Sequence, residues 1–397
     1  MEKYKLGEIS EFIRNGASIK QFDNADGYPI TRIETISNFK IDFEKMGYAN
    51  IYELGKYEDY LLKNGDILMS HINSDVHLGK SAVMEDDSKK IIHGMNLLCI
   101  RLKKEMANSK YMYYYFNHKL FRNKLSKIIK KSVNQASFSV TDLKKIDIEI
   151  PNIETQKKIV EVLDKAQFLI DKKKEQIELL DELVKSRFIE MFGDPKINPK
   201  NWTIMELKNL MLLANNGLSR RGNDEEGNIV LRLVELQNGY IDYTNVNRIK
   251  LTESEEKRYL LKEGDFLFAR VNGNPDYVGR CAYFKNIGEN VFHNDHIIRV
   301  RFDSEILNND YATSVLNSKY GKLQMKDKLK TSAGQYTINQ TGISEIKIPI
   351  PPMELQNEFA EFVTQIDSIR SKMEASLSEL EDNFNSLMQK AFKGELF

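Results

Sequence analysis

The stretches IEIPNIETQKKIVEVL, residues 148–163, and IPIPPMELQNEFAEFV, residues 348–363, decide the fold of this chain. In each stretch a short apolar strand pattern ends at a proline, and apolar residues then recur with the spacing of a helix. The helical pattern runs from Glu154 to about Phe192 and from Glu354 to about Phe392. The chain therefore contains the same strand-to-helix transition twice, about 200 residues apart.

Both transitions belong to a longer internal repeat, because the chain overlays on itself after a shift of 200 residues. One block slips by a single residue, since Leu62-Lys-Asn-Gly-Asp66 matches Leu261-Lys-Glu-Gly-Asp265, and the register returns at Gly79 and Gly279. Two copies of one unit are the economical interpretation. Other matched pairs are Arg32 and Arg232, Asp42 and Asp242, His93 and His293, Tyr111 and Tyr311, and Gln156 and Gln356.

Both helical stretches carry a heptad pattern in the same register, which favours a coiled coil over an ordinary amphipathic helix. A helix of 39 residues would be roughly 58 Å long. The two helices most simply pair with each other, and the alternative is that each packs on its own globular domain. The residues predicted to pair are Leu163, Ile170, Ile177, Leu180, Val184, Val363, Ile366, Leu377, Leu380 and Phe384.

The remaining sequence predicts an α+β fold class, with two mixed α/β domains that alternate with the two long helices. Short alternating strands are separated by turn residues such as Asn64-Gly65-Asp66, and Gly193-Asp194-Pro195 ends the first helix. The expected order is a first domain over 1–151, a helix over 152–195, a second domain over 196–351 and a helix over 352–397.

The composition is ordinary for a globular protein, with 41% hydrophobic and 29% charged residues. No apolar run approaches the roughly 18 residues that would suggest a membrane span, and the N-terminus has no signal-peptide pattern. Only Cys99 and Cys281 are present, which excludes a disulfide scaffold. We therefore expect a cytoplasmic protein with no membrane partner.

Basic residues gather at the same place in each copy, although 58 Lys and Arg balance 58 Asp and Glu overall. Residues 119–131 contain six basic side chains and no acidic one, and residues 319–330 contain five basic and one acidic. A basic helix in each copy favours phosphate contacts, and the alternative is a solvated helix face. The predicted phosphate contacts are Lys119, Arg122, Lys124, Lys127, Lys130, Lys131, Lys319, Lys322, Lys326, Lys328 and Lys330.

No catalytic or metal-binding motif is complete in this sequence. Asn274-Pro275-Asp276-Tyr277 resembles the Asn-Pro-Pro-Tyr loop of amino-methyltransferases, but its third residue is Asp and no glycine-rich cofactor loop accompanies it. Gly79-Lys80-Ser81 resembles the end of a phosphate-binding loop, but the upstream glycine is replaced by Ser74. The histidines have no cysteine or carboxylate partners at metal-ligand spacing, so we expect no metal site.

The order of motifs resembles that of the specificity (S) subunit of type I restriction-modification systems, the HsdS family, over the whole chain. The blocks Gly65-Asp-Ile-Leu68 and Gly264-Asp-Phe-Leu267 come first in their copies. A Ser-x-x-Gln segment follows in each copy, and Ile-Pro-x-x-x-x-Gln then leads into the long helix. The chain closes with Gly394-Glu-Leu396. No single motif is specific, but their duplicated order is.

This resemblance implies that each domain is a target recognition domain that reads one half of a bipartite, asymmetric site in double-stranded DNA. The helices would pair as an antiparallel coiled coil, giving a pseudo-two-fold repeat, and would hold two methyltransferase (M) subunits. Two restriction/translocase (R) subunits would complete a type I site-specific deoxyribonuclease and adenine-N6 DNA methyltransferase. S-adenosylmethionine, ATP and Mg²⁺ would act in those partner subunits, with no cofactor and no catalytic residue in this chain.

Base or groove contacts are expected from polar side chains of the two domains, because Arg, Asn, Gln and His match the hydrogen-bonding groups at base edges. For each of them the alternative is a turn or framework role, above all for the two glutamines that recur in both copies. The candidates are His71, Asn73, Lys80, His93, Gln135, Ser137, Arg270, Asn272, Arg280, His293, Gln335 and Tyr336.

Two other functions remain open at this point. A scaffold that does not bind DNA would use the coiled coil alone, and salt-insensitive or absent DNA binding by its complex would identify it. The same specificity role in a methylation-only complex would involve no R subunit, and a neighbouring translocase gene would argue against it.

Overall fold

The computed structural model describes residues 1–22, 24–37, 39–73, 77–131, 136–332 and 334–397. Within them the chain forms two compact units. Unit 1 contains Met1–Lys174 and Ala375–Phe397, and unit 2 contains Glu175–Glu374. Each unit therefore combines one globular part with a segment of both long helices, so the compact units differ from the order of domains along the chain.

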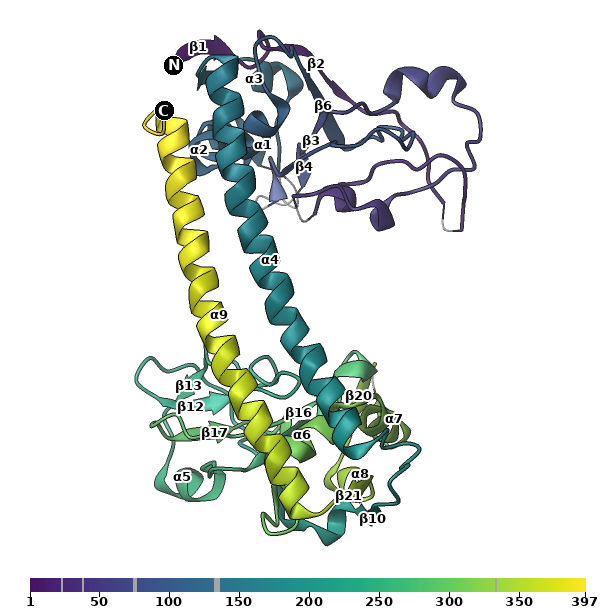
Figure 1. The fold of residues 1–397 in the computed structure, drawn as a ribbon, viewed down its shortest axis with the longest axis vertical. Helices are drawn as coiled ribbons and strands as arrows, with labels where there is room; N and C mark the ends of the chain where they lie inside the picture. Colours follow the sequence, from purple (N-terminus) through teal and green to yellow (C-terminus); the bar gives the residue numbers. More distant parts are fainter. Residues whose placement is uncertain (23, 38, 74–76, 132–135, 333) are drawn as a thin grey trace. The chain divides into compact units, whose positions relative to one another are not determined.

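The globular part of unit 1 is built on a four-stranded antiparallel sheet in the order β2-β6-β3-β5 (Figure 1). A separate pair joins β1 to β9, and a short sheet has the order β4-β8-β7. The strands are β1 (Glu2–Lys5), β2 (Ser10–Asn15), β3 (Ile67–Ser70), β4 (Ile72–Asn73), β5 (Ser81–Val83), β6 (Leu97–Leu102), β7 (Lys130–Lys131), β8 (Ala136–Ser137) and β9 (Asp147–Ile150). The helices are α1 (Ser109–Asn117), α2 (Lys119–Leu125) and α3 (Val140–Lys144), with 3-10 helices η1 (Ile33–Ile36), η2 (Phe43–Lys45), η3 (Gly55–Tyr60) and η5 (Ser126–Ile128).

Unit 2 repeats this plan, with β11-β18-β14-β16 as its four-stranded sheet, β10 paired with β21, and β15-β20-β19 as its short sheet. It also contains a further three-stranded sheet, β13-β12-β17, and the helix α5. At the equivalent place in unit 1, Ile30 forms isolated β-bridges to Gly47 and Ile92. The strands are β10 (Thr203–Glu206), β11 (Met211–Asn216), β12 (Asn228–Leu231), β13 (Arg248–Ile249), β14 (Phe266–Ala269), β15 (Val271–Asn272), β16 (Cys281–Tyr283), β17 (Val291–His293), β18 (Ile297–Phe302), β19 (Lys330–Ser332), β20 (Gln335–Thr337) and β21 (Lys347–Ile350). The helices are α5 (Glu253–Tyr259), α6 (Asn309–Asn317), α7 (Lys319–Asp327) and α8 (Gln340–Ser344), with η6 (Leu207–Asn209) and η7 (Pro275–Tyr277).

The central strands β3 and β14 are buried along their whole length, which explains their continuous apolar sequences. Alternate side chains of a strand point to opposite faces. Ile67 and Met69 therefore join one hydrophobic core together with Tyr111 of α1, whereas Leu68 joins a second core with Cys99. Each unit thus has a core on both faces of its main sheet.

The Gly-Asp motif of each copy forms the turn before this central strand. Gly264 has φ +82°, a left-handed conformation that glycine adopts without strain. The buried carboxylate of Asp265 accepts hydrogen bonds from Arg301 Nε at 2.7 Å and Nη2 at 2.9 Å, and from the backbone N–H of Lys262 at 2.8 Å. Asp66 makes the same contacts with Arg101 and Lys63 in unit 1. The motif therefore ties the turn to the neighbouring strand.

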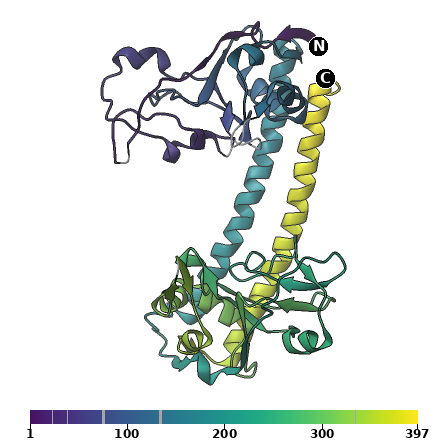
Figure 2. The ribbon, with the colours of Figure 1, turned by 180° about the vertical axis from the view of Figure 1, so that it is seen from behind.

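The two long helices are α4 (Ile153–Phe192) and α9 (Met353–Lys393), within two residues of the predicted limits. In unit 1 the first turns of α4 and the last turns of α9 lie side by side in both views (Figures 1 and 2). Ile159 and Leu163 of α4 share the core of this unit with Ala391 and Phe392 of α9. The Phe392 ring lies 5.5 Å from the Tyr111 ring, measured between centroids. The helices therefore pair antiparallel and also pack on the globular part, so both of the predicted packing modes occur.

Unit 2 contains the other ends of both helices in the same arrangement. Phe188 and Phe192, near the end of α4, pack against Phe359 of α9 and Tyr311 of α6. The Arg187 guanidinium of α4 pairs with the Glu358 carboxylate of α9 at 2.9 Å. The predicted α+β fold, with two copies of one plan and a pair of long helices, is confirmed.

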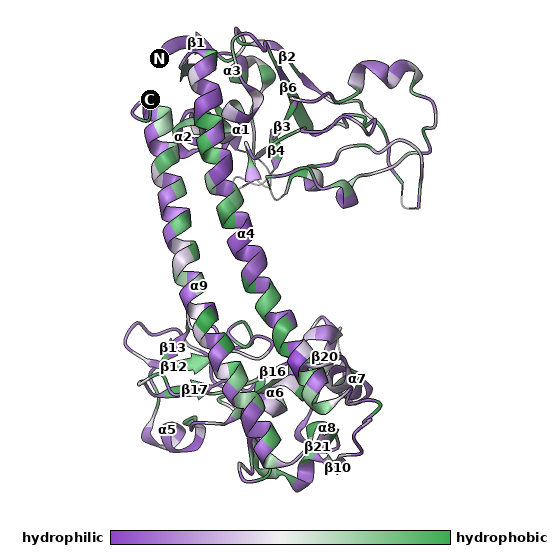
Figure 3. Ribbon diagram, viewed as in Figure 1, coloured by the Kyte–Doolittle hydropathy of each residue, from purple (hydrophilic) through white to green (hydrophobic). Residues whose placement is uncertain are grey.

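The heptad positions lie on the less exposed face of each helix, and apolar and polar residues alternate along both (Figure 3). In unit 1 an ion pair of 2.7 Å joins Lys174 of α4 to Glu381 of α9. Among the residues predicted to pair, Leu163, Ile170 and Ile366 are buried, and Ile177, Leu180, Val184, Val363, Leu377, Leu380 and Phe384 are half-buried.

Candidate nucleic-acid interface

The short sheet of unit 1 brings several predicted contact residues together. Asn73 of β4 pairs with Ala136 of β8, and Ser137 pairs with Lys130 of β7. This sheet starts directly after the buried strand β3, so a rigid core fixes its position. Gln135, another candidate, lies outside the described residues. Ser137 and Lys130 therefore share one face of this small sheet and Asn73 lies on the other, because paired residues share a face and neighbours along a strand alternate.

The short sheet of unit 2 has the same topology but presents different side chains. Asn272 of β15 pairs with Tyr336 of β20, whose neighbour Gln335 is exposed, and Lys330 begins β19. The side-chain oxygen of Asn272 accepts a 2.9 Å hydrogen bond from the backbone N–H of Asn274, which stabilises the following loop. Asn73 and Lys130 of unit 1 therefore recur as Asn272 and Lys330, whereas Tyr336 stands where unit 1 has Ala136.

The basic stretch of residues 119–131 is not one helix, which corrects the sequence-based expectation. Helix α2 ends at Leu125, and Lys130 and Lys131 form β7. In unit 2 the helix likewise ends at Asp327, before β19. Pairing with the next strand, β8 in unit 1 and β20 in unit 2, places part of the positive charge on the short sheets, beside the polar residues described above.

The basic side chains of residues 119–131 and 319–330 also differ in their burial and in their bonding partners. Arg122 is half-buried, and burial lowers its pKa. Three lysines are held within their units: Lys124 Nζ donates to the Asp147 carbonyl at 2.8 Å, Lys326 pairs with Asp276 at 2.5 Å, and Lys328 pairs with Glu345 at 2.6 Å. Lys322 is half-buried, and the exposed candidates outside those ion pairs are Lys119, Lys127, Lys130, Lys131, Lys319 and Lys330.

The predicted histidines are buried, which corrects their assignment as base or groove contacts. His93 is 1% exposed and His293 is 0% exposed. Burial lowers the pKa of His93 to about 4 and that of His293 to about 3, so both imidazoles are neutral at pH 7. His93 Nε2 lies 2.9 Å from the Leu97 carbonyl. His71 is 7% exposed and packs against the edge of Phe138, and burial lowers its pKa as well. These three residues belong to the framework.

Lys80 and Arg280 occupy equivalent positions, each beside an exposed aromatic ring that sequence analysis missed. Lys80 Nζ donates to the Ser37 carbonyl at 3.2 Å and lies 5.1 Å from the centre of the Phe39 ring. The Arg280 guanidinium lies 5.2 Å from the centre of the Tyr277 ring. Phe39 has φ +60° where the second copy has a glycine, so a bulky residue is held at a turn in a conformation of high energy. In the sequence, the replacement of the glycine of this repeated turn by Phe39 was the signal that could have identified this residue.

Around Arg270 the structure gathers three further residues that sequence analysis also missed. Arg270 Nη1 donates to the Asp295 carbonyl at 3.1 Å. Arg221 Nη2 donates to Asp295 Oδ1 at 2.7 Å and to His296 Nε2 at 3.0 Å. We call Arg221, Arg270, Asp295 and His296 the turn cluster, because Asp295 and His296 form the turn between β17 and β18. Arg221 and Asp295 are 74 residues apart in sequence, so no local pattern could have linked them.

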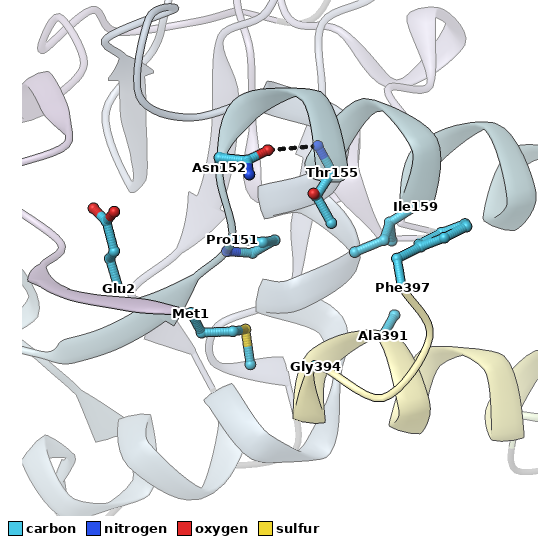
Figure 4. A pocket seen from close by; sticks show the side chains of 9 residues that line it. All are labelled: Met1, Glu2, Pro151, Asn152, Thr155, Ile159, Ala391, Gly394 and Phe397. Carbon is cyan, nitrogen blue, oxygen red and sulfur yellow. Dashed lines mark hydrogen bonds between the residues drawn. The ribbon is translucent and has the colours of Figure 1, made fainter.

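One pocket at the helix ends of unit 1 offers no comparable chemistry. A pocket of about 280 Å³ lies in unit 1, between the start of α4 and the end of α9 (Figure 4). Glu2 is its one ionisable side chain, and Asn152 caps α4 by accepting from the Thr155 N–H at 2.9 Å. No group of three His, Cys, Asp or Glu that could hold a metal is present in the described part of the chain. Among the same residues, no helix is long and apolar enough to cross a membrane.

Comparisons with known proteins match the repeated organisation of the chain. The family model of the type I restriction modification DNA specificity domain matches residues 1–179 and 199–382. The chain is 29% identical to a putative type I restriction enzyme MjaX specificity subunit of Methanocaldococcus jannaschii, over 100% of this chain and 93% of that protein. It is 28% identical to the type I restriction enzyme StySPI specificity subunit of Salmonella potsdam, over 94% of this chain and 83% of that protein.

Two solved structures share the fold. One is a chain from a study of complex assembly and conformational transition in a type I R-M system, with a TM-score of 0.59, 14% identity, and coverage of 100% of this chain and 98% of that chain. The other is the S subunit of a type I restriction-modification system from M. genitalium, with a TM-score of 0.52, 15% identity, and coverage of 98% and 96%.

Proposed function

The chain belongs to the specificity-subunit family of type I restriction-modification systems, a family whose role is DNA recognition, and from this premise we propose that units 1 and 2 each read one half of a bipartite, asymmetric DNA target. Double-stranded DNA is the ligand, and the two half-sites differ in sequence.

The observation that carries this proposal is one framework used twice with different surfaces. Both units contain the same four-stranded sheet, the same Gly-Asp turn and the same short sheet. At equivalent positions, however, the short sheets present Ala136 in unit 1 and Tyr336 in unit 2, and Lys131 in unit 1 and Thr331 in unit 2. An equivalent scaffold with unlike hydrogen-bonding groups is what recognition of two unlike half-sites requires.

The exposed lysines of the basic stretches would contact phosphates next to these readers. Lys127 and Lys130 are exposed in unit 1, as are Lys319 and Lys330 in unit 2. Phosphate contacts fix the register of a protein on DNA but carry no direct sequence information. They would supply affinity while the short sheets and their neighbouring turns supply discrimination.

The solvent faces of α4 and α9 would dock the partner subunits. In unit 1, Phe168 and Leu169 of α4 are 59% and 53% exposed, and in unit 2 Leu179 and Leu183 are 58% and 47% exposed. Exposed apolar side chains that gather on one element suit a protein partner. We assign methyl transfer with S-adenosylmethionine to two M subunits, and ATP-driven translocation and Mg²⁺-dependent cleavage to two R subunits, with a non-catalytic role for this chain.

The test is methylation mapping with and without this chain. Host DNA is sequenced for modified adenines after expression of the M subunit alone and together with the chain. We expect a bipartite motif only when both are present. The same motif from the M subunit alone would refute the proposed role, and absence of DNA binding by the assembled complex would favour a scaffold. Cleavage upon addition of an R subunit separates restriction from a methylation-only complex.

A further inference from the structure

The turn cluster of unit 2 lies where the main sheet meets the short sheet. Arg270 stands between β14 and β15, and its backbone is held on both sides. Its N–H donates to the His296 carbonyl at 2.8 Å, and its carbonyl accepts from the Ile338 N–H at 2.9 Å. The preceding Ala269 is 1% exposed. The Cα of Arg270 is therefore fixed by the core, so its side chain starts from a defined position.

Hydrogen bonds within the cluster orient the charged groups. The carboxylate of Asp295 accepts from Arg221, and the carbonyl of the same residue accepts from Arg270. An arginine has no acceptor, so Nε2 of His296 accepts from Arg221 and the proton of this imidazole lies on Nδ1. Asp295 thus binds both guanidinium groups, Arg221 through its carboxylate and Arg270 through its carbonyl, and two cations against one carboxylate leave a net positive charge.

Arg270 retains donors for an external ligand. Its half-buried side chain makes one hydrogen bond in the described part of the chain, through one of five N–H donors. Arg221, by contrast, is held by Asp295 and by the carbonyls of Leu218 and Ser219. Arg221 and Asp295 are therefore positioning residues, and Arg270 is the residue that can reach outward.

Unit 1 has the same backbone arrangement but none of this chemistry. Met95 N–H donates to the Ala17 carbonyl at 3.0 Å, as Asp295 N–H does to Leu218 at 2.9 Å. The turn therefore carries Met95 and Asn96 in unit 1, and the buried His71 takes the place of Arg270. A position that keeps its backbone contacts and changes its side chains between the copies behaves as a reader rather than as framework.

We propose that Arg270 reads one guanine in the half-site of unit 2, by donating two parallel hydrogen bonds to guanine O6 and N7 in the major groove, with its guanidinium oriented by Asp295 and Arg221. This inference rests on the proposed function. Guanine presents two acceptors there, whereas adenine places a donor at N6, so a guanidinium discriminates between them. The half-site read by unit 2 therefore contains a G·C pair that depends on Arg270.

The experiment uses the complex of this chain with its M subunits, on a library of randomised half-sites. Arg270→Ala should reduce the preference for guanine at one position by roughly five- to 150-fold. The other half-site should keep its sequence. Asp295→Asn weakens the ion pair by which Arg221 holds this turn but keeps the carbonyl that accepts from Arg270, so it should reduce the same preference by a smaller factor at an unchanged melting temperature. Arg220→Ala is the control, because the neighbouring Arg220 pairs with Glu255 and should leave the motif unchanged.

Arg270→Lys keeps the charge and an aliphatic stem, so it tests the inference even if the Arg270→Ala chain does not assemble with its M subunits. We expect this variant to weaken the guanine preference, because an ammonium lacks the fixed fork of a guanidinium, while the salt dependence of binding stays the same. Unchanged base preference in both variants would overturn the inference, as would a uniform loss of affinity with a smaller salt slope, which indicates a phosphate contact. A wild-type motif without guanine in that half-site would overturn it too. Wild-type complex with no motif at all would instead refute the proposed function.

Discussion

Gln356 offers the sharpest test of how the long helices are joined to the globular parts. This side chain is fully buried near the start of α9. Its Oε1 accepts from the Asn308 N–H at 2.8 Å, and its Nε2 donates to the carbonyls of Ile306 at 3.0 Å and Pro351 at 2.8 Å. Gln156 makes the same three bonds at the start of α4. The motif Ile-Pro-x-x-x-x-Gln therefore fastens each helix to the loop before α6 or α1.

Gln356→Met keeps the size of the side chain and removes all three hydrogen bonds. The variant leaves one buried N–H and two buried carbonyls without their partner. At about 1–1.5 kcal/mol for each bond, the free energy of unfolding of unit 2 should fall by about 3–5 kcal/mol. Chemical denaturation of the purified complex, followed by a probe in unit 2, measures this loss. The matched control is Gln365→Met on the exposed face of the same helix, with an expected change within about 0.5 kcal/mol.

Gln356→Glu adds a test of the direction in which the loss of stability changes with pH. A carboxylate can still accept from the Asn308 N–H, but its second oxygen faces two carbonyl oxygens that need a donor. The protonated form is therefore favoured in the folded state, which raises the pKa of the new carboxyl group and makes the loss of stability larger at pH 8 than at pH 6. A Gln356→Met variant as stable as its control, or a Glu variant whose loss does not depend on pH, would refute this role for the motif.

Three further results are expected. Lys127→Ala with Lys130→Ala should weaken binding to all DNA sequences alike and reduce the salt slope by roughly one unit per contact, measured by fluorescence anisotropy over a salt series. Phe359→Ala, which removes a fully buried ring shared by both helices and α6, should lower the free energy of unfolding by about 3–5 kcal/mol in denaturation experiments. Burial lowers the pKa of His93 and His293 below the ordinary 6.5, so the unfolded state binds protons first as the pH falls. Each residue should therefore cost about 2 kcal/mol of stability between pH 7.5 and pH 5. A His→Gln variant at either position should abolish its share of this pH dependence.

Each of these results has a contrary outcome. A shift in base preference at an unchanged salt slope would assign the two lysines to base contacts, and Lys185→Ala on the exposed face of α4 is their control. Phe168→Ala, at a 59% exposed ring, should change stability by less than about 0.5 kcal/mol, and an equal loss at both phenylalanines would contradict the packing described. Histidine variants with the wild-type pH dependence would show that other groups cause it.

Local signals in the sequence were sufficient for the long helices, and the repeat was evident from self-similarity after a shift of 200 residues. The heptad spacing and the proline before each helix depend on neighbouring residues alone, and both helices begin within one residue of the predicted start. The compact units could not be predicted in this way. Residues such as Leu163 and Ala391 join one core although they are far apart in sequence, and only tertiary packing brings them together.

The candidate site was less accessible to sequence reasoning, for two physical reasons. Lys130 and Lys131 continue a helical pattern, but pairing with Ser137 and Ala136 overrides that preference. Burial also depends on the whole fold, so the histidines looked like polar readers and proved to be core residues. Polar groups that meet only in space, as Arg221 and Asp295 do, leave no pattern along the chain.

The most direct test of the central claim is replacement of residues 202–350 by the equivalent segment of another family member, followed by mapping of methylated adenines in a host that expresses the chimaera with its M subunits. Each unit is expected to read its half-site independently, because each has its own main sheet, its own short sheet and its own core. The prediction is that one half of the methylated motif changes to that of the donor protein while the other half is retained. A chimaera that assembles and methylates, but in which both halves of the motif change or neither does, would contradict the claim that two units read two half-sites.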